Sequence, residues 1–408
     1  MSSAVRNYAL VTSAYWGFTL TDGALRMLVL LHFHALGYSA FEIALLFILY
    51  EVAGIITNLV GGWLAQARGL RFTLYAGLSL QIASLCALSL TDPTWLPAIS
   101  VAYVMGLQAA SGVAKDLTKM SSKSAIKVLV PANAEGALFK WVALLTGSKN
   151  ALKGLGFFMG GALLSWLGFA GALLAMAAGL AITLVAVALS LGNAMSGPTG
   201  GVKPKFREVF SGDRKINVLS AARLFLFGSR DIWFVVGLPV YLAAELGWGH
   251  IEVGTYMAAW VIGYGFVQAV APKILRASSK EPDGRTARFW IFALIAVSVA
   301  ITAAIVRDIS PEIAVLCGLI VFGIVFAINS SLHSYLILAY ADGDKVAMNV
   351  GFYYMSNAIG RLTGTILSGV AYMYGGLTGC LTVSIGFLTM SWIISIALPD
   401  RKTVQQVS

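Results

Sequence analysis

Residues 36–43 read Leu36-Gly37-Tyr38-Ser39-Ala40-Phe41-Glu42-Ile43, and residues 246–253 read Leu246-Gly247-Trp248-Gly249-His250-Ile251-Glu252-Val253. The two stretches match at an offset of 210 residues, and each one stands between two long apolar runs. Such a repeated turn predicts a chain built from two similar halves, with this turn between the first and second helix of each half.

The composition predicts a membrane protein. Apolar residues make up 58% of the 408 residues and charged residues only 11%, whereas about a quarter of the residues are charged in an average soluble domain. One bilayer crossing takes about 20 mainly apolar residues, and the chain divides into twelve such runs separated by short polar joints. We therefore expect an all-α membrane protein with twelve transmembrane helices in two six-helix halves.

The predicted helices cover residues 7–36, 39–66, 70–90, 95–119, 138–166 and 167–191 in the first half, and 216–246, 250–275, 289–306, 311–341, 347–374 and 376–398 in the second. The residues between the two sets are rich in Gly, Pro and Lys. The predicted domains are an N-terminal half (1–191), a basic cytoplasmic linker (192–215) and a C-terminal half (216–408).

Lysine and arginine collect in alternate loops, as is typical of the cytoplasmic side of membrane proteins. With both termini inside, the outer loops carry only Arg307, and the inner loops carry Arg68, Arg71, Lys123, Lys127, the linker cations Lys203, Lys205, Arg207, Arg214 and Lys215, the segment 276–288 and Lys345. We expect both termini in the cytoplasm. This asymmetry also explains the net charge of +10, so no nucleic-acid partner is expected.

The loop after the second predicted helix reads Gly62-Trp63-Leu64-Ala65-Gln66-Ala67-Arg68-Gly69-Leu70-Arg71. It resembles the GxLaDrxGrr signature of the major facilitator superfamily, although Gln66 stands where that signature has an acid. The resemblance implies the major facilitator fold and a gating loop that contains Gly62, Gly69 and Arg71. No HExxH, GxSxG or GxxxxGK[ST] pattern occurs, so we expect no enzyme and no cofactor.

Charged residues inside the predicted helices are the candidates for function, because an ionisable group in the bilayer core is costly and normally faces the interior. Asp22 and Arg26 are spaced i,i+4 in the first helix, and they are either an ion pair that fixes packing or part of a functional site. Lys149 and Lys153 repeat this spacing in the fifth helix without an acid nearby in sequence. Two such lysines need a counter-anion, which favours a functional interpretation.

The second half has a comparable set of polar residues. Arg230 adjoins Asp231, and we expect that Asp231 does not neutralise it, because neighbouring side chains on a helix point about 100° apart. The eleventh helix carries a polar stripe of Tyr353, Asn357 and Arg361, and the tenth carries Asn329 and His333 at the same spacing.

The central positions predict an anionic substrate with more than one negative charge, because arginine and lysine suit phosphate, arsenate or carboxylate oxygens. The central cations are Arg26, Lys149, Lys153, Arg230 and Arg361, against the acids Asp22 and Asp231. A substrate gripped near the midplane by alternating access is expected. Asp22, Asp231 and Asp116 are the candidates for proton coupling, and uniport driven by the membrane potential remains an alternative.

Lys115, Lys119, Lys123 and Lys127 follow one another at four-residue spacing where the fourth predicted helix leaves the membrane. This ladder is either a membrane anchor or a funnel that attracts an anion from the cytoplasm. We include Lys115 and Lys119 among the substrate-binding candidates.

Three polar stretches, Ala14–Arg26, Ser111–Lys123 and Gly147–Gly154, resemble those of the ArsJ-type organoarsenical efflux permeases. The resemblance implies a bacterial inner-membrane exporter of 1-arseno-3-phosphoglycerate that confers arsenate resistance. It also implies a functional partner, glyceraldehyde-3-phosphate dehydrogenase, that supplies the substrate. Cys86, Cys317 and Cys380 lie in separate apolar runs, which suits a pentavalent rather than a thiol-bound arsenic compound.

Other functions remain open. A phosphate or sugar-phosphate importer or exchanger would share the cationic residues, and a receptor without transport has no distinguishing sequence feature. A multidrug proton antiporter predicts acidic and aromatic central residues, which the excess of cations disfavours. The four histidines suggest no metal site, and His32 and His34 are expected to pack at the outer end of the first helix. We expect a monomer.

Overall fold

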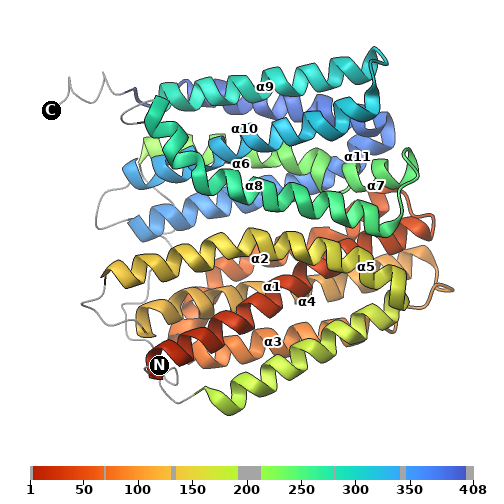
Figure 1. Cartoon of the computed structure of the whole chain (residues 1–408), viewed down its shortest axis with the longest axis vertical. Coiled ribbons are helices and arrows are strands. Elements are labelled where there is room, and N and C mark those ends of the chain that lie inside the picture. The colour runs from red at the N-terminus through yellow and green to blue at the C-terminus, as the bar shows by residue number, and fades with distance from the viewer. Residues whose placement is uncertain are drawn as a thin grey trace. The chain divides into compact units, whose positions relative to one another are not determined.

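The computed structural model describes residues 3–68, 70–129, 135–191, 213–278, 282–340 and 346–400, and within these ranges it leaves out side chains such as those of residues 58–68 and 122–147. The regular structure of the described part is helical throughout. Figure 1 shows its elements, which are α1 (Ser3–Ala35), α2 (Ala40–Arg68), α3 (Leu70–Leu88), α4 (Pro97–Leu129), α5 (Glu135–Ser190), α6 (Arg214–Phe234), α7 (Gly237–Ala244), α8 (His250–Ser278), α9 (Gly284–Val306), α10 (Pro311–Tyr340) and α11 (Val346–Ser395).

Both α5 and α11 consist of two helices joined at a glycine. Gly168 has a φ of 68° and Gly376 a φ of 56°, a left-handed conformation that costs other residues about 1–2 kcal/mol. The breaks lie where the sequence predicted helix boundaries, near residues 166 and 375. Each of these elements therefore corresponds to two of the predicted helices.

The span predicted over residues 216–246 corresponds to one membrane-length segment, Arg214–Ala244, but its helix is divided into α6 and α7. Pro239 has no N–H to donate to the carbonyl of Val235, and its ring clashes with a continuing helix. The freed N–H groups of Val236 and Gly237 donate to the Ser368 hydroxyl, at 3.3 and 3.1 Å. This serine of α11 therefore stabilises the break.

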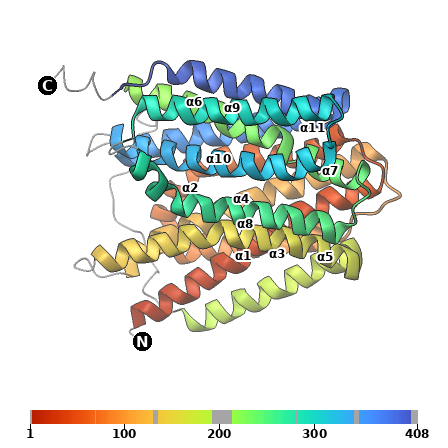
Figure 2. The same ribbon diagram turned by 45° about the horizontal axis from the view of Figure 1, so that its top comes forward.

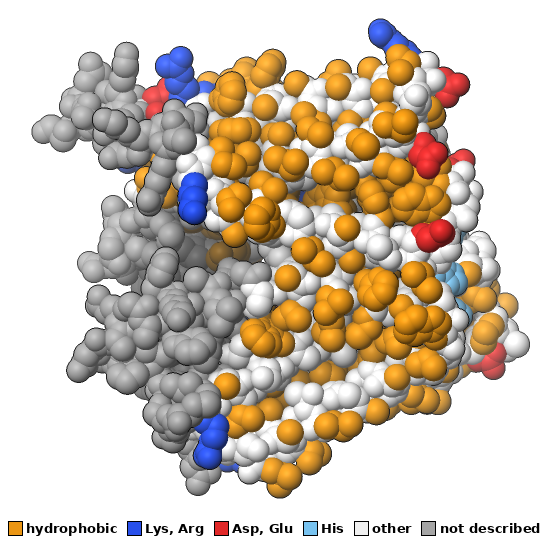
Figure 3. Space-filling view, viewed as in Figure 1, with side chains coloured by type: hydrophobic (Ala, Val, Ile, Leu, Met, Phe, Trp, Pro, Cys, Tyr) orange, Lys and Arg blue, Asp and Glu red, His pale blue; other side chains and the backbone are white. Residues whose placement is uncertain are grey.

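Nine of the described segments are long and apolar enough to cross a membrane. Two of them, Ser148–Ser190 and Tyr353–Ser395, contain the glycine breaks and are long enough for two crossings each. The element α1 is not among the nine because polar residues such as Asp22 and Arg26 interrupt its apolar run. Apolar side chains cover much of the described helix surface in Figure 3, as a lipid environment requires.

Contacts divide the chain into two compact units. Unit 1 comprises Met1–Tyr38, Leu45–Lys203 and Trp248–Ile262, and unit 2 comprises Ser39–Ala44, Pro204–Gly247 and Gly263–Ser408. The division into 1–191, 192–215 and 216–408 stays a prediction. Residues 192–212 of the linker, with Lys203, Lys205 and Arg207, lie outside the described residues, as does Lys345.

Within unit 1, glycines let α1 and α5 approach closely, and Figures 1 and 2 show the two helices side by side. A Cβ on Gly156 would lie 2.5 Å from the carbonyl oxygen of Leu20, and one on Gly23 would lie 2.7 Å from that of Lys153. Gly156 of α5 and Gly23 of α1 are thus close-packing positions. Their packing places the Lys153 backbone beside the turn of α1 that carries Asp22 and Arg26.

Within unit 2, α6 packs against α11 in the same way. Gly360 lies against the carbonyl oxygen of Leu224, and a Cβ on Gly364 would lie 2.7 Å from that of Gly228. The side chains that precede and follow these glycines on α11 therefore lie next to side chains of α6.

Candidate functional site

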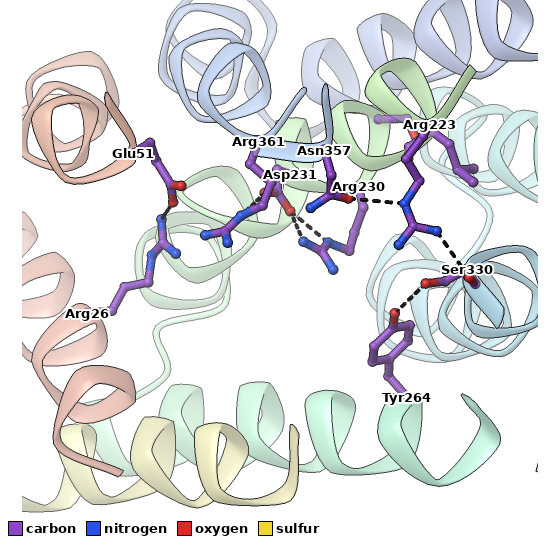
Figure 4. Close-up of polar contacts among 11 residues, drawn as sticks. Arg26, Glu51, Arg223, Arg230, Asp231, Tyr264, Ser330, Asn357 and Arg361 are labelled. Carbon is purple, nitrogen blue, oxygen red and sulfur yellow. Dashed lines mark hydrogen bonds and ion pairs between the residues drawn. The ribbon is translucent and has the colours of Figure 1, made fainter. Parts of the chain in front are cut away.

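The ion pair in unit 1 joins α1 to α2. Arg26 Nη2 donates to Glu51 Oε1 at 3.2 Å, with 13% of the Arg26 and 3% of the Glu51 side chain exposed (Figure 4). Asp22 instead accepts a hydrogen bond from the Tyr50 hydroxyl at 2.6 Å. The predicted alternative of an Asp22–Arg26 ion pair is wrong, because these two described side chains each turn to a partner on α2.

Glu51 is a candidate functional residue that the sequence prediction missed. It is a glutamate inside the apolar α2, so the rule that selects charged residues within spans also selects it. We refer to Asp22, Arg26, Tyr50, Glu51 and Lys115 as the Arg26 cluster.

Lys115 of α4 completes this cluster. A Cβ on Gly112 would lie 2.6 Å from the Tyr50 carbonyl oxygen, so α2 and α4 touch here. One turn later, Lys115 Nζ lies 3.9 Å from the centre of the Tyr50 ring, an attractive cation–π distance. The Arg26 guanidinium contacts the same ring at 5.8 Å. One phenol ring is therefore shared by two cations.

The rest of the lysine ladder follows along α4, which extends to Leu129, ten residues beyond the predicted end. Lys119 Nζ donates to the buried Asp116 at 3.0 Å. Asp116 thus has a cationic partner, and its predicted coupling role stays a prediction. The side chains of Lys123 and Lys127 lie outside the described residues.

The two lysines of α5 differ in environment. Lys153 is half-buried, with Nζ 5.5 Å from the centre of the Phe157 ring, and Lys149 is exposed. Trp16 Nε1 donates to Ser148 Oγ at 2.9 Å, which fixes this turn of α5 against α1. Of the two lysines, Lys153 has the surroundings expected of a substrate ligand.

The ion pairs in unit 2 centre on Asp231, whose side chain is 2% exposed. Arg230 donates to Asp231 Oδ1 from Nε at 2.7 Å and also from Nη2, and Arg361 Nε lies 3.5 Å from Oδ2 (Figure 4). The prediction that Asp231 leaves Arg230 unneutralised is wrong, because the long arginine side chain bends along the helix to its neighbour. We call Arg230, Asp231 and Arg361 the Arg230 cluster.

Arg223, two turns before Arg230 on α6, is 4% exposed. Its Nε donates to Asn357 Oδ1 at 3.2 Å, and its Nη1 donates to the Ser330 carbonyl oxygen at 3.1 Å. Tyr264 and Gln268 donate to the Ser330 hydroxyl, each at 3.2 Å. Polar residues of α8, α10 and α11 therefore lie around this arginine of α6 (Figure 4).

The remaining site residues predicted in unit 2, Tyr353, Asn329 and His333, have different surroundings. Tyr353 lies in the apolar core, with its ring centre 4.8 Å from the Arg223 guanidinium. Asn329 donates to the Trp290 carbonyl oxygen at 2.9 Å, so it joins α10 to α9. His333 is fully buried on α10, one turn after Ser330, whose carbonyl oxygen accepts from Arg223.

The predicted gating loop is described only in part. Arg71 Nε donates to the Tyr75 hydroxyl at 3.1 Å, Gly69 lies outside the described residues, and Gly62 is part of α2. Its gating role stays a prediction.

Each unit has more cations than acids around its polar cluster. In unit 1, Arg26, Lys115, Lys119 and Lys153 stand against three acids, Asp22, Glu51 and Asp116. In unit 2, three arginines stand against Asp231. Among the described residues, no three His, Cys, Asp or Glu side chains form a group that could hold a metal ion. The arrangement is suited to binding an anion through guanidinium and ammonium groups.

Solved structures of transporters have the same fold. The chain is similar to a bacterial homologue of the iron transporter ferroportin in the inward-facing state, with a TM-score of 0.72, 13% identity, and coverage of 96% of this chain and 98% of that one. It is also similar to a POT family transporter in complex with 5-aminolevulinic acid (TM-score 0.74, 15% identity, 96% and 95% coverage). A POT family transporter in complex with a thioalcohol conjugated peptide gives a TM-score of 0.73, 16% identity and 96% and 95% coverage. At these low sequence identities, the similarity to the three structures shows a shared fold and nothing more.

The sequence itself matches a family model. No curated protein matches the chain, but the model of the Major Facilitator Superfamily matches residues 10–365. This match agrees with the helices, the glycine-separated spans and the fold of the solved transporters. The chain therefore belongs to the Major Facilitator Superfamily, and it is an all-helical, multi-pass membrane transporter rather than an enzyme.

Proposed function

We propose that this transporter exports an organic anion from the cytoplasm by alternating access, and that the anion is 1-arseno-3-phosphoglycerate. The observation that carries the proposal is the excess of buried or half-buried cations over acids in each unit. Such an excess is unfavourable in a membrane interior unless an anion joins it.

The partial neutralisation within each unit favours release as well as binding. Arg26 keeps one bond to Glu51, and Arg230 and Arg361 share Asp231. An incoming phosphate or arsenate oxygen competes with these carboxylates for the same N–H donors. When the substrate leaves, Glu51 and Asp231 pair again with Arg26, Arg230 and Arg361, so that these three guanidinium groups have a partner in both states.

The choice of an arsenylated phosphoglycerate comes from the resemblance of three polar stretches to the ArsJ-type permeases. Two of these stretches contribute Asp22, Arg26 and Lys115 to the Arg26 cluster, and the third contributes the half-buried Lys153. On this proposal the protein lies in a bacterial inner membrane with both termini in the cytoplasm. A glyceraldehyde-3-phosphate dehydrogenase supplies the substrate.

The energy source is the membrane potential alone or a proton gradient. Export of each negative charge is favoured by about 2.3 kcal/mol per 100 mV at an inside-negative potential, so uniport is sufficient. Asp22, Asp116, Asp231 and now Glu51 are the acids that a proton antiport would use. Abolishing the pH gradient while holding the potential separates the two, because undiminished efflux eliminates obligatory antiport.

Uptake into inverted vesicles tests the substrate. Vesicles that contain the transporter are expected to accumulate the arsenylated triose made by the dehydrogenase from arsenate, and vesicles with Arg26→Ala are expected not to. Uptake of phosphate or phosphorylated trioses with no uptake of the arsenylated compound would instead favour a phosphate or sugar-phosphate transporter.

A further inference from the structure

Arg223 is a buried cation for which the described residues provide no carboxylate. Its two hydrogen-bond acceptors, Asn357 Oδ1 and the Ser330 carbonyl oxygen, are both neutral. No Asp or Glu in the described part of the chain lies within ion-pair distance of it. A buried guanidinium without an opposite charge is unfavourable, so an anion at this position would stabilise the protein.

The guanidinium is held in place and keeps donors available. Its central carbon lies 3.7 Å from the centre of the Phe227 ring and 4.8 Å from that of Tyr353, and aromatic faces of this kind fix a guanidinium plane. Its two hydrogen bonds use two of the five N–H donors of an arginine. The other donors remain for a ligand.

His333 is the second observation that points to a ligand. It is fully buried on α10, one turn after Ser330, and within the described residues neither of its ring nitrogens has a hydrogen-bond partner. Buried polar groups nearly always have such a partner. The imidazole lies one turn after Ser330, whose carbonyl oxygen accepts from Arg223, and it therefore marks a place for a further polar group.

The surroundings of Arg223 and His333 are separate from the Arg230 cluster but adjoin it. Arg223, Phe227 and Arg230 lie on one face of α6, and the Phe227 ring contacts both guanidinium groups, at 3.7 and 5.3 Å. Seven residues of helix correspond to about 10 Å. Asn357 and Arg361 are likewise one turn apart on α11, so the half-exposed Asn357 stands between the two places (Figure 4).

We propose that Arg223, His333 and Asn357 form a second anion-binding site in unit 2, and that the transported substrate carries an acidic group at each end of a short chain. One group binds Arg230 and Arg361, and the other replaces the Asn357 oxygen as the acceptor for Arg223. A charged oxygen makes a stronger bond to a guanidinium than an amide oxygen does. The inference rests on the proposed function, since it assumes that the substrate is an organic anion.

Binding of two related anions to the purified full-length protein in lipid nanodiscs tests this site. Glycerol 3-phosphate carries an acidic group at one end, and 3-phosphoglycerate carries one at both. We expect the dissociation constant of 3-phosphoglycerate to be at least about tenfold lower, the effect of one good charged contact. In Arg223→Gln the two constants are expected to agree within about twofold. Arg285→Gln changes an exposed arginine of α9 and is expected to keep the wild-type ratio.

Asn357→Asp provides a second variant in case Arg223→Gln does not fold. It puts a carboxylate of the same size beside Arg223, which neutralises the guanidinium from within. The melting temperature is expected to stay or rise, while the preference for 3-phosphoglycerate is lost. A purely structural role of Arg223 would leave that preference intact.

Three outcomes are informative. Equal wild-type binding of the two compounds, or a preference that survives in both variants, would overturn the second site while leaving an organic-anion transporter in place. Failure of the wild-type protein to bind either compound would contradict the proposed function together with the inference.

Discussion

Arg26 and Glu51 are 25 residues apart in sequence, and their side chains form an ion pair of 3.2 Å between α1 and α2. The pair is nearly buried, and Arg26 Nε has no hydrogen-bond partner among the described residues. Arg26 therefore uses one of its donors for the internal acid and keeps another for a second acceptor. On the proposed function, Glu51 would have two roles, since it would neutralise Arg26 in the empty site and compete with the substrate for its N–H groups.

A double-mutant cycle tests the pair. Arg26→Gln and Glu51→Gln are each expected to lower stability by about 1–3 kcal/mol, because each leaves a charge buried without its partner. The double variant is expected to lose clearly less than the sum of the two. Thermal unfolding of the purified protein, followed by tryptophan fluorescence, measures this coupling. Additive losses, within about 0.5 kcal/mol, would mean that the two side chains do not interact.

Asp231→Asn tests competition between the internal carboxylate and the substrate. Asp231 accepts hydrogen bonds from Arg230 and pairs with Arg361, so its neutralisation frees both guanidinium groups. We expect the apparent KM for the transported anion to fall by about threefold or more and the maximal rate to fall with it, because tighter ground-state binding slows release. Vesicle uptake over a range of substrate concentrations gives both values.

Asp92→Asn is the matched control for this prediction. Asp92 lies in the exposed turn between α3 and α4, where the backbone N–H and the hydroxyl of Thr94 donate to it and lower its pKa. Its substitution is expected to leave both kinetic values unchanged. A KM that rises in Asp231→Asn would indicate that Asp231 supports substrate binding instead of opposing it.

The breaks inside α5 and α11 could be predicted because they depend on local chemistry. Gly168 and Gly376 adopt left-handed backbone conformations that the neighbouring residues would resist, and such breaks are visible in the sequence. The division between α6 and α7 was equally local, because Pro239 signals it. The sequence analysis used the apolar run to predict one span there and did not use the proline to predict the break.

The partners of the charged residues could not be predicted in the same way. Asp22 and Arg26 share a helix face, yet the rotation of α1 against α2 gives them Tyr50 and Glu51 as partners. Arg230 reaches Asp231 because an arginine side chain is long enough to bend to its neighbour. The sequence shows which charged residues each helix carries. Which of them come into contact depends on how the helices pack at Gly112, Gly156 and Gly360.

Gly156→Ala tests the packing that positions the Arg26 cluster. A methyl group on Gly156 would lie 2.5 Å from the Leu20 carbonyl oxygen and 3.1 Å from Gly23 Cα, so α1 and α5 must separate. We expect a stability loss of about 1–3 kcal/mol, as for other overpacked interiors, together with reduced transport. Gly179→Ala adds the same methyl group to the second part of α5, where no atom lies within 4 Å. That control is expected to be neutral or slightly stabilising, and equal losses in the two variants would contradict the packing role.

Substitution of Lys119 tests whether the lysine ladder of α4 is an electrostatic funnel for the anion or a membrane anchor. It is partly exposed and pairs with Asp116, at the position where α4 carries the lysine ladder. If the ladder attracts the anion, Lys119→Gln lowers kcat/KM by about two- to fivefold at low ionic strength, and the difference from wild type shrinks as salt screens the field. At saturating substrate the transport rate is expected to return to the wild-type value, because electrostatic steering changes how often substrate meets the transporter and not how fast bound substrate is transported.

Two variants serve as controls for this prediction. Lys119→Arg keeps the charge and is expected to keep the rate, and Lys273→Gln removes an exposed lysine of α8. A loss in Lys119→Gln that is the same at all salt and substrate concentrations would instead assign Lys119 to the structure of α4.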